Sequence, residues 1–346
     1  MAEFNRILVT GAAGFIGSGY VRYVVEQHAA TQLVAFDALT YAGNPQNLDG
    51  LGDRVTFVRG DIADVEAVRA AMEGVDAVVN FAAESHVDRS LQDARPFVRT
   101  NVEGVAVLLD EARRARVRRF LQVSTDEVYG DLSGSDRHSL ETDVLAPRSP
   151  YAATKAAAEH LVRSYGISYG MDVVITRGSN TYGPRQYPEK IIPLFITNAL
   201  MDMPLPLYGQ GTAVRDYLYV DDHCAGIDTV LHLGASGEAY NLGARTEVTG
   251  VEVARSLLRH LRKPEGLIQF VADRPGHDYR YSVDPGRAEA LGWVRRVAWD
   301  EGLAATARWY ADNRAWWDAV RGSAGFRGYV QRHYGPRLSQ TQAAGE

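Results

Sequence analysis

The sequence predicts an α/β protein built on a doubly wound, Rossmann-type parallel sheet of about seven strands, with a smaller mixed α/β lobe toward the C-terminus. Two observations carry this prediction. Short, apolar, β-rich runs alternate with helical patterns through the first half of the chain, which describes βαβ units on a sheet buried on both faces. After residue 180 the pattern becomes less regular and richer in Pro and Gly, which indicates the second lobe.

The expected elements follow in order along the chain. The strands are 6–10, 33–37, 55–59, 77–83, 119–125 and 172–178, and the strand-like run 239–243 follows in the second half. The helices are 17–27, 64–73, 97–116, 150–169, 190–201, 221–233, 249–262 and 300–319. We expect a first domain over 1–180 that also receives part of 215–245, an interleaved lobe over 181–336, and a disordered tail over 337–346.

The composition predicts a soluble, cytoplasmic protein. Hydrophobic residues make up 46% of the 346 residues and charged residues 23%, and no apolar run is long enough to cross a bilayer. The N-terminus enters a strand-like run without the features of an export signal. The single cysteine, Cys224, fits a reducing compartment. A net charge of -6 argues against broad nucleic-acid binding, and we predict neither a membrane partner nor a metal site.

A glycine-rich turn connects the first strand to the first helix. Gly11, Gly14 and Gly17 form a G-x-x-G-x-x-G relative of the dinucleotide fingerprint. Glycines at these positions let the backbone approach a pyrophosphate at the positive end of the helix. A purely structural turn is the alternative interpretation, and the carboxylates that follow weaken it.

Two aspartates follow the next strands. Asp37 ends the second strand 20 residues after Gly17, where a carboxylate can bind both ribose hydroxyls and would repel a 2′-phosphate. This favours NAD over NADP. Asp61 and Ile62 follow the third strand and could hold the adenine, although Asp61 could equally be a helix cap.

Tyr151 and Lys155 lie four residues apart, so they share one face of a helix. Alone, such a pair is more often a surface contact. Beside a dinucleotide site, however, an ammonium and an oxidised nicotinamide would both favour the phenolate and lower the pKa of the tyrosine. We therefore expect Tyr151 to remove a proton from a substrate hydroxyl while the cofactor takes a hydride from the same carbon.

Thr125, Asp126 and Glu127 stand at the carboxyl end of a strand, where ligands of an open α/β sheet gather. Thr125 could bind the same substrate oxygen as Tyr151. Two adjacent carboxylates exceed what hydride transfer requires, so they suggest a second chemical step. The alternative is a solvated turn acid next to a helix cap.

These motifs resemble the extended short-chain dehydrogenase/reductases, specifically the dTDP-glucose 4,6-dehydratases. The resemblance covers about residues 6–285 in order, with few gaps. The matching segments are TGAAGFIG (10–17), FDALTYAGN (36–44), GDI (60–62), FAAESHVDRS (81–90), STDEVYGD (124–131), SPYAATKAAAEHLV (149–162), NTYGPRQYPEKIIPL (180–194), RDYLYVDDH (215–223), YNLG (240–243) and DRPGHDYRY (273–281).

The resemblance implies an NAD-dependent hydro-lyase. Tyr151, assisted by Lys155 and Thr125, would deprotonate the 4-hydroxyl of the hexose during oxidation at C4. Glu127 would then remove the proton from C5 while Asp126, held protonated, protonates the departing 6-hydroxyl. The hydride would return to C6, so that NAD stays bound and is regenerated in each turnover, and a 4-keto-6-deoxy sugar would leave.

The resemblance also carries individual contacts over to this chain. It places NAD against Gly11, Gly14, Phe15, Ile16, Gly17, Asp37, Leu39, Thr40, Asp61, Ile62, Ala82, Ala83, Thr100, Tyr151, Lys155 and Thr181. It places the nucleotide sugar against Ser85, Thr125, Asn180, Glu189, Lys190, Pro206, Leu207, Tyr208, Arg215, Asn241, Arg274 and His277. Thr181 departs from the family pattern, which has asparagine there, and this puts one cofactor contact in doubt.

Several alternatives stay open. A 4-epimerase would generally lack both Asp126 and Glu127, and a non-catalytic NAD-sensing protein would need none of the five catalytic residues. These motifs do not distinguish a dTDP-glucose 4,6-dehydratase from a 4,6-dehydratase that acts on a UDP-, CDP- or GDP-hexose. The resemblance also implies a homodimer through the helices 97–116 and 150–169, whose apolar faces could equally cover the sheet of one subunit.

Overall fold

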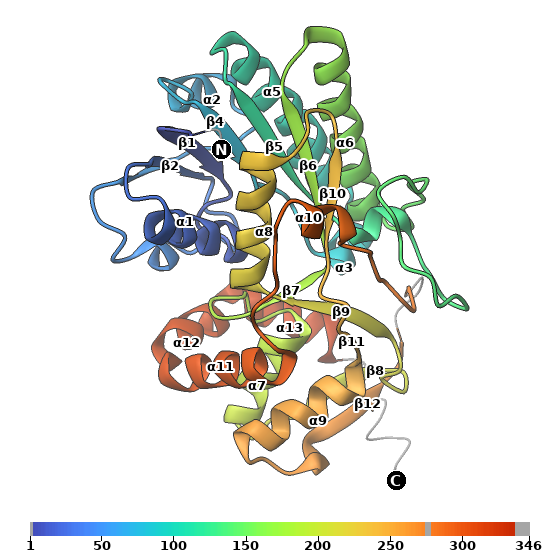
Figure 1. The fold of residues 1–346 in the computed structure, drawn as a ribbon. Coiled ribbons are helices and arrows are strands. Elements are labelled where there is room, and N and C mark those ends of the chain that lie inside the picture. Colours follow the sequence, from blue (N-terminus) through green and yellow to red (C-terminus); the bar gives the residue numbers. More distant parts are fainter. Residues whose placement is uncertain (1–2, 274–277, 336–346) are drawn as a thin grey trace.

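A computed structural model describes residues 3–273 and 278–335. Its largest sheet has seven parallel strands in the order β10-β6-β5-β4-β1-β2-β3 (Figure 1). The strands are β1 (Arg6–Thr10), β2 (Gln32–Asp37), β3 (Val55–Arg59), β4 (Ala77–Asn80), β5 (Arg119–Thr125), β6 (Val173–Gly178) and β10 (Ala239–Leu242). The strand order reverses direction at β1, which confirms the doubly wound sheet predicted from the sequence.

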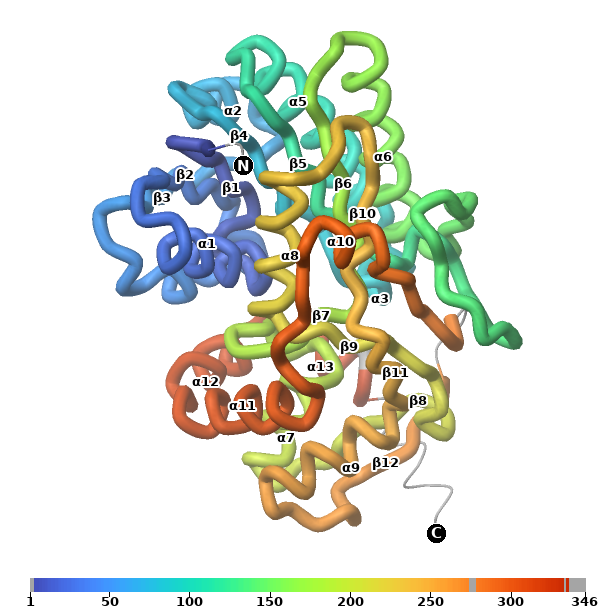
Figure 2. Tube along the Cα trace, viewed as in Figure 1, coloured from blue at the N-terminus to red at the C-terminus, as the bar shows by residue number. Residues whose placement is uncertain are grey.

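Strand β1 shows why its central residues, Ile7, Leu8 and Val9, are all apolar. Ile7 and Val9 pack in the core cluster that contains residues of α1 (Phe15–Gln27) and α8 (Val220–Leu233). Leu8 packs in the opposite cluster, which contains residues of α2 (Val65–Ala71), α5 (Val105–Arg114) and α6 (Pro150–Tyr169). Alternate residues of a strand point to opposite faces, so helices on both faces require apolar residues at every position. Figure 2 shows α1 and α8 side by side on one face.

Helix α6 has the bounds that its terminal signals predict. Ser149 caps its first turn by accepting a hydrogen bond from the backbone N–H of Ala152, and Pro150 occupies the first helical position. Gly170 ends the helix in the left-handed conformation. This helix carries Tyr151 and Lys155 to the sheet.

Two expected helices prove to be divided. The helix predicted over 97–116 consists of α4 (Arg95–Val98), a π-helical turn η2 (Arg99–Gly104) and α5. The Asn101 side chain in this turn accepts a hydrogen bond from Glu84 N and donates one to Glu84 O. The helix predicted over 300–319 is α11 (Trp299–Asp312) and α12 (Arg314–Gly322), divided at the non-helical Asn313. Helical periodicity does not reveal such interruptions, because both segments keep the expected apolar spacing.

The rest of the chain builds two smaller sheets and further helices. One sheet is β11-β9-β7, formed by Glu247–Thr249, Val214–Tyr219 and Asn180–Tyr182, and the other pairs β12 (Ile268–Val271) with β8 (Leu205–Tyr208). The helices are α3 (Val87–Gln92), α7 (Ile191–Leu200), α9 (Gly250–Leu261), α10 (Gly286–Ala290) and α13 (Ala324–His333), with short 3-10 turns η1 (Pro45–Leu48), η3 (Asp126–Tyr129) and η4 (Glu265–Leu267). The predicted disordered tail lies outside the described residues.

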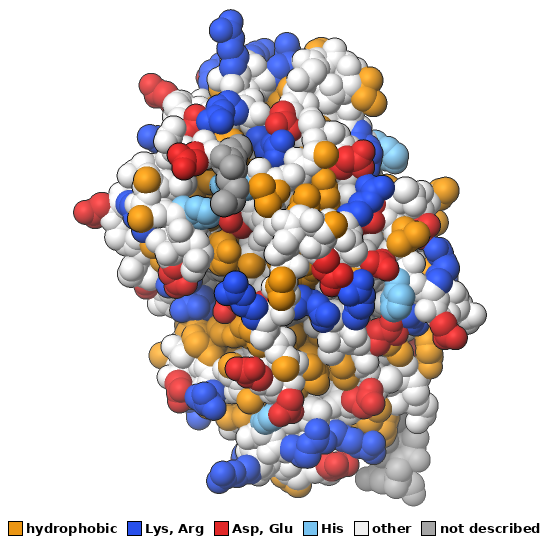
Figure 3. All heavy atoms as spheres, in the orientation of Figure 1, with side chains coloured by type: hydrophobic (Ala, Val, Ile, Leu, Met, Phe, Trp, Pro, Cys, Tyr) orange, Lys and Arg blue, Asp and Glu red, His pale blue; other side chains and the backbone are white. Residues whose placement is uncertain are grey.

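Charged side chains of both signs are interspersed over the face shown in Figure 3. Among the described residues, no helix combines the length and the hydropathy that a membrane span requires.

Candidate active site

A cavity of about 830 Å³ opens at the carboxyl ends of β1, β2, β4, β5 and β6. This edge is where open α/β sheets bind their ligands. The predicted site residues that line the cavity are Gly11, Gly14, Phe15, Ile16, Gly17, Asp37, Thr40, Asp61, Ile62, Ala82, Ala83, Ser85, Thr100, Thr125, Asp126, Glu127, Tyr151, Lys155, Asn180, Thr181, Glu189 and Lys190. One cavity therefore holds the glycine turn, the tyrosine–lysine pair and the two carboxylates.

The glycine turn has no room for side chains. A Cβ atom at Gly11 would lie 2.8 Å from the backbone nitrogen of Ala82, and a Cβ at Gly17 would lie 2.2 Å from the carbonyl oxygen of Gly11. Gly14 precedes α1 and cannot cap it, because it has no side chain. The N–H groups of the first turn therefore point toward the cavity with the positive end of the helix dipole, as an anionic phosphate would require.

The carboxylate of Asp37 lines the cavity at the end of β2. It accepts hydrogen bonds from the backbone N–H of Ala13 (2.9 Å) and of Leu39 (2.7 Å). Burial raises the pKa of Asp37, and the backbone hydrogen bonds oppose this rise. The carboxylate is thus held rigidly where a ribose would lie.

Asp61 is not the cap of helix α2. That role belongs to Asp64, whose side chain accepts hydrogen bonds from the first-turn N–H groups of Glu66 and Ala67. Asp61 instead accepts hydrogen bonds from the backbone N–H of Ala63 (2.9 Å) and from the Arg99 guanidinium (2.7 Å), and its side chain lines the cavity.

Lys155 lies in the same cavity as Tyr151, one turn further along helix α6. Its buried Nζ donates a hydrogen bond to the carbonyl oxygen of Val123 at 2.7 Å, and burial lowers the pKa of Lys155 to about 8. Burial also raises the pKa of Tyr151, and the charges of Glu127 and Asp126 raise it further. A hydrogen bond with the Thr125 hydroxyl favours the phenolate and lowers this pKa.

Asp126 and Glu127 begin the turn η3 directly after β5. Asp126 is 4% exposed, and burial, together with the negative charge of Glu127, raises its pKa to about 8. Its Oδ1 accepts a hydrogen bond from the Thr125 hydroxyl (3.2 Å), while Oδ2 has no partner among the described residues. Burial and the charge of Glu127 therefore both favour the protonated form of this carboxyl group at neutral pH.

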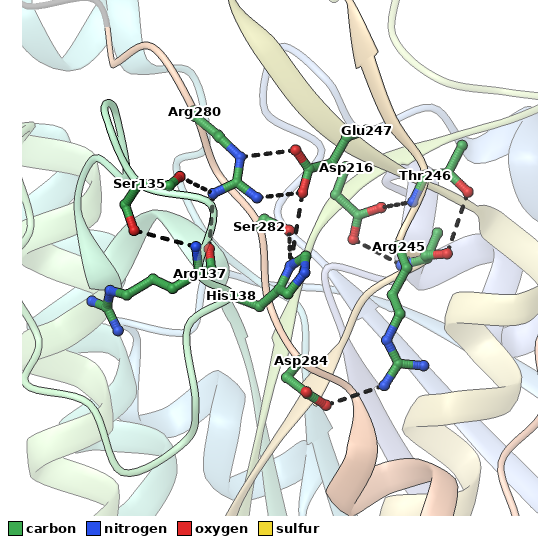
Figure 4. Close-up of polar contacts among 11 residues, drawn as sticks. Ser135, Arg137, His138, Asp216, Arg245, Thr246, Glu247, Arg280, Ser282 and Asp284 are labelled. Carbon is green, nitrogen blue, oxygen red and sulfur yellow. Dashed lines mark hydrogen bonds and ion pairs between the residues drawn. The ribbon is translucent and has the colours of Figure 1, made fainter.

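A second buried carboxylate, Asp216, also raises the pKa of Asp126, whereas the nearby Arg215 lowers it. Figure 4 shows how the chain holds Asp216: its oxygens accept hydrogen bonds from the backbone N–H groups of Ala244 (2.8 Å) and Thr246 (2.7 Å). The same view shows the Arg280 guanidinium, which binds the carboxylate of Glu247 and the carbonyl oxygens of Ser135 and Arg137. The negative charge that acts on Asp126 is therefore fixed in place.

Some predicted residues do not line the cavity. Leu39 only donates its N–H to Asp37, and Pro206, Leu207 and Tyr208 lie on β8. The Arg215 guanidinium donates to the carbonyl oxygens of Val214, Asp278 and Tyr279. The Asn241 amide is fully buried, with Oδ1 bonded to Tyr129 and Nδ2 to Ser139 O. The predicted contacts of Arg274 and His277 lie outside the described residues.

The sequence analysis missed other residues that line the cavity. These are chiefly Tyr41, Glu84, Arg95, Arg99, Gln186, Tyr187, Tyr217 and His223. Several are adjacent to motif residues, for example Gln186 and Tyr187 before Glu189, so this proximity was the available signal. His223 ends the motif RDYLYVDDH (215–223), so for this residue too the motif was the available signal.

A group of potential metal ligands lies away from the cavity. His28 Nε2 is 2.9 Å from Asp228 Oδ2, and His232 Nδ1 is 2.9 Å from the carbonyl oxygen of Asp228. These contacts connect the end of α1 to α8, and each polar atom in them already has a protein partner.

The residues fit a bound NAD: a glycine turn at a helix N-terminus lies beside Asp37, and Tyr151 with Lys155 lies in the same cavity. A seven-stranded sheet of this order with such a site defines an enzyme of the short-chain dehydrogenase/reductase class.

Comparisons with known proteins narrow this class. The family model of GDP-mannose 4,6 dehydratase matches residues 8–306. A dTDP-glucose 4,6-dehydratase of Streptomyces niveus is 47% identical over 323 residues, covering 91% of this chain and 96% of that protein. The low-salt glycan biosynthesis protein Agl12 of Haloferax volcanii is 49% identical over 306 residues, covering 88% and 98%. The chain belongs to the nucleotide-sugar 4,6-dehydratase family.

Solved structures are similar over nearly the whole fold. DesIV, a dTDP-glucose 4,6-dehydratase of Streptomyces venezuelae solved with NAD and a TDP ligand, has a TM-score of 0.88 and 48% identity, covering 91% of this chain and 99% of that one. A UDP-glucose 4-epimerase of Thermus thermophilus, solved with NAD, has a TM-score of 0.83 and 32% identity, covering 89% and 99%. The fold is thus common to dehydratases and epimerases, and the site residues must distinguish them.

Proposed function

We propose that the protein converts dTDP-glucose to dTDP-4-keto-6-deoxyglucose and water with a tightly bound NAD. The observation that carries this proposal is the pair Asp126 and Glu127 in the same cavity as Tyr151 and Lys155. An alcohol oxidation needs one base, whereas an elimination also needs an acid and a second base. The relatives named as dTDP-glucose 4,6-dehydratases support the choice of substrate.

Each residue has a chemical task in this reaction. Tyr151, hydrogen-bonded to Thr125, removes the proton of the 4-hydroxyl. When bound, NAD accepts the hydride from C4 and later returns it to C6. The 4-ketone acidifies the C5 proton, which Glu127 removes during the elimination, and a proton returns to C5 when the hydride reaches C6. Asp126, protonated at neutral pH, gives its proton to the departing 6-hydroxyl.

The cofactor and the substrate divide the cavity. The NAD side in this proposal consists of the glycine turn, Asp37, Thr40, Asp61, Ala82 after strand β4 and Thr100 in the turn η2. Ser85, Asn180, Glu189 and Lys190 form the sugar side. Lys190 donates a hydrogen bond to the carbonyl oxygen of Ser85 (3.2 Å), and Glu189 forms an ion pair with Arg89 (3.1 Å). These contacts fix the positions of the Lys190 and Glu189 side chains.

Mass spectrometry tests this function directly. The purified protein is incubated with dTDP-glucose and with UDP-glucose in separate tubes, without added cofactor. We expect dTDP-glucose to lose one water and UDP-glucose to react more slowly or not at all. An isomerised UDP-sugar of unchanged mass would instead indicate a 4-epimerase. Unchanged substrates in both tubes, even after NAD is added, would contradict the dehydratase assignment and leave an NAD-sensing protein.

We further propose that the protein is a cytoplasmic homodimer that pairs through α4–α5 and α6. The inner side of α6 covers its own sheet through Ala158 and Val162. Its outer side exposes Ala153, Ser164 and Ile167, which allow close helix packing. Light scattering should give twice the chain mass, and Ile167→Glu should shift it to that of one chain. A wild-type protein of single-chain mass would contradict this pairing.

A further inference from the structure

A buried guanidinium joins the two elements that carry the carboxylates and the tyrosine–lysine pair. Arg177 on β6 is 2% exposed, and its Nε and Nη2 atoms donate hydrogen bonds of 2.7 to 3.1 Å to the carboxylate of Glu159. Glu159 is fully buried and lies one turn beyond Lys155 on α6. The Nη1 atom of Arg177 donates to the hydroxyl of Tyr129, 2.7 Å away. Tyr129 is the last residue of η3, the turn that begins with the two carboxylates.

The side chain of Tyr129 is held from two sides. Its hydroxyl accepts the bond from Arg177 and donates its own proton to Asn241 Oδ1 on β10, at 2.7 Å. The Asn241 amide is itself anchored, because Nδ2 donates to the carbonyl oxygen of Ser139. The guanidinium also lies over the Tyr129 ring, with 4.8 Å between its central carbon and the ring centroid. The network therefore fixes one end of η3, while the Thr125 hydroxyl caps the other end.

Stability alone does not account for this arrangement. Two buried charges lose their hydration, and replacing such a pair by well-packed apolar residues is often neutral or stabilising. Tyr129, Arg177 and Glu159 do not line the cavity, so they can affect the reaction only through other residues. The elimination is sensitive to such effects, because Glu127 must reach C5 of a sugar whose C4 hydroxyl is held by Tyr151. A displacement of about 1 Å between reacting groups can cost about 100-fold in rate.

We propose that the Arg177–Glu159 pair, acting through Tyr129, holds η3 at a fixed distance from α6 and so positions the two carboxylates for the elimination. This inference rests on the proposed function. The three residues are positioning residues. Oxidation at C4 uses residues of α6, which the bond from Lys155 to the carbonyl oxygen of Val123 ties separately to β5. A weakened network should therefore slow water loss more than oxidation.

Tyr129→Phe breaks the connection and leaves the buried ion pair intact. The ring stays, and Arg177 keeps Glu159 and the carbonyl oxygen of Glu141 as partners. The purified protein with its bound cofactor is mixed rapidly with dTDP-glucose, and absorbance of the reduced cofactor and mass spectrometry of the sugar follow the two steps. We expect oxidation at nearly the wild-type rate, water loss slower by about 10- to 100-fold, and reduced cofactor that accumulates.

Tyr20→Phe is the matched control. Tyr20 is also buried, and its hydroxyl donates a hydrogen bond to Asp228 on α8, at 3.3 Å. The substitution removes a buried tyrosine hydroxyl without touching the network, so it should leave the ratio of the two rates unchanged.

Arg177→Lys is a second variant, should Tyr129→Phe fail to fold. Lysine keeps the charge that Glu159 requires but lacks the planar fork that also reaches Tyr129, so the same selective loss of elimination is expected. An unchanged ratio of the two rates in Tyr129→Phe, or in Arg177→Lys where only that variant folds, would overturn the positioning role, because a purely structural contribution leaves this ratio alone. A wild-type protein that removes no water from dTDP-glucose would instead contradict the proposed function itself.

Discussion

The ammonium of Lys155 donates a hydrogen bond to the carbonyl oxygen of Val123, with 2.7 Å between the two atoms. This bond ties helix α6 to strand β5 inside the buried part of the cavity. It also directs the ammonium to a neutral backbone group, while a hydrogen bond with the Thr125 hydroxyl lowers the pKa of Tyr151.

Thr125→Val should therefore slow the oxidation step. Loss of the hydrogen bond to the phenolate should reduce kcat by about 10- to 100-fold and move the acidic limb of the pH–rate profile to higher pH. Initial rates measured across a series of pH values check this. Thr125→Ser is the matched control, because it keeps the hydroxyl that also caps η3. An unshifted acidic limb in Thr125→Val would contradict the role of this hydroxyl.

Glu127→Gln should separate oxidation from elimination. The variant keeps Tyr151, Lys155 and Thr125, so it should still oxidise C4, but without a base at C5 water loss should fall by at least about 100-fold. Ultraviolet absorbance of the reduced cofactor and mass spectrometry of the sugar measure the two steps separately. Glu265→Gln, at a surface position, is the control. Full dehydratase activity of Glu127→Gln would show that another group is the base.

Asp126 should support the dehydration but lower the stability of the folded protein as the pH rises. Its pKa rises from 3.8 to about 8 on folding, so the folded protein takes up a proton, and stability falls as the pH rises from about 4 to about 8. Asp126→Asn cannot ionise and should escape this loss. Its melting temperature should therefore exceed that of the wild type by more at pH 8 than at pH 5, while dehydration falls by about 100-fold or more. The rate of the wild-type protein should also decline above about pH 8. A difference in melting temperature that does not grow with pH would contradict the raised pKa.

Gly17→Ala should abolish cofactor binding. The new Cβ would lie 2.2 Å from the carbonyl oxygen of Gly11, and backbone on both sides leaves no flexible group to move away. We expect protein without bound NAD and a lower melting temperature. Gly266→Ala, where nothing lies within 4 Å of an added Cβ, should keep both properties. Normal NAD content in the Gly17→Ala protein would show that the turn can rearrange.

The His28–Asp228 pair should give a pH-dependent contribution to stability. The hydrogen bond to Asp228 raises the pKa of His28 above 6.5, so the stabilisation is present below about pH 6.5 and is lost as the pH rises through the higher, folded-state value. His28→Asn should therefore be less stable than the wild type at pH 6 and nearly equal at pH 9. The effect should stay below about 1 kcal/mol, because the pair is partly exposed. Urea unfolding at both pH values measures it, and an equal deficit at both would exclude protonation as the cause.

The sequence predicted the sheet well because its strands carry a strong local signal. The bounds of β1, β5 and α6 match the expected 6–10, 119–125 and 150–169. Thr125, Asp126 and Glu127 were found for a related reason: they stand at a strand end, and parallel strands bring such ends to one edge. Tyr151 and Lys155 were found by their spacing on one helix face. The interruption at Asn101 could not be predicted, because helical spacing is kept across it and its side chain bonds to Glu84, in another segment.

The hydrogen-bond partners of individual side chains could not be predicted from the sequence either. Asn241 and Arg215 match the substrate-binding positions of the family, yet their polar groups bond to the protein itself. His223 was missed although it ends the motif at 215–223, because the motif does not say which of its residues reaches the cavity. The pKa of Asp126 depends on burial and on Asp216, which lies 90 residues further along the chain.

The chain returns to the large sheet after it has begun the smaller lobe, and this limits how the lobe can be exchanged between related enzymes. Helix α8 and strand β10 follow β7, β8 and β9 in the sequence but pack on the large sheet. A fragment that stops at residue 180 would lack the edge strand and the helix that covers α1, leaving core residues such as Val24 and Val174 in water. A substrate lobe cannot therefore be transplanted between enzymes of this kind by a single cut. A chimaera needs at least two crossovers, with residues 220–242 retained from the protein that supplies the sheet.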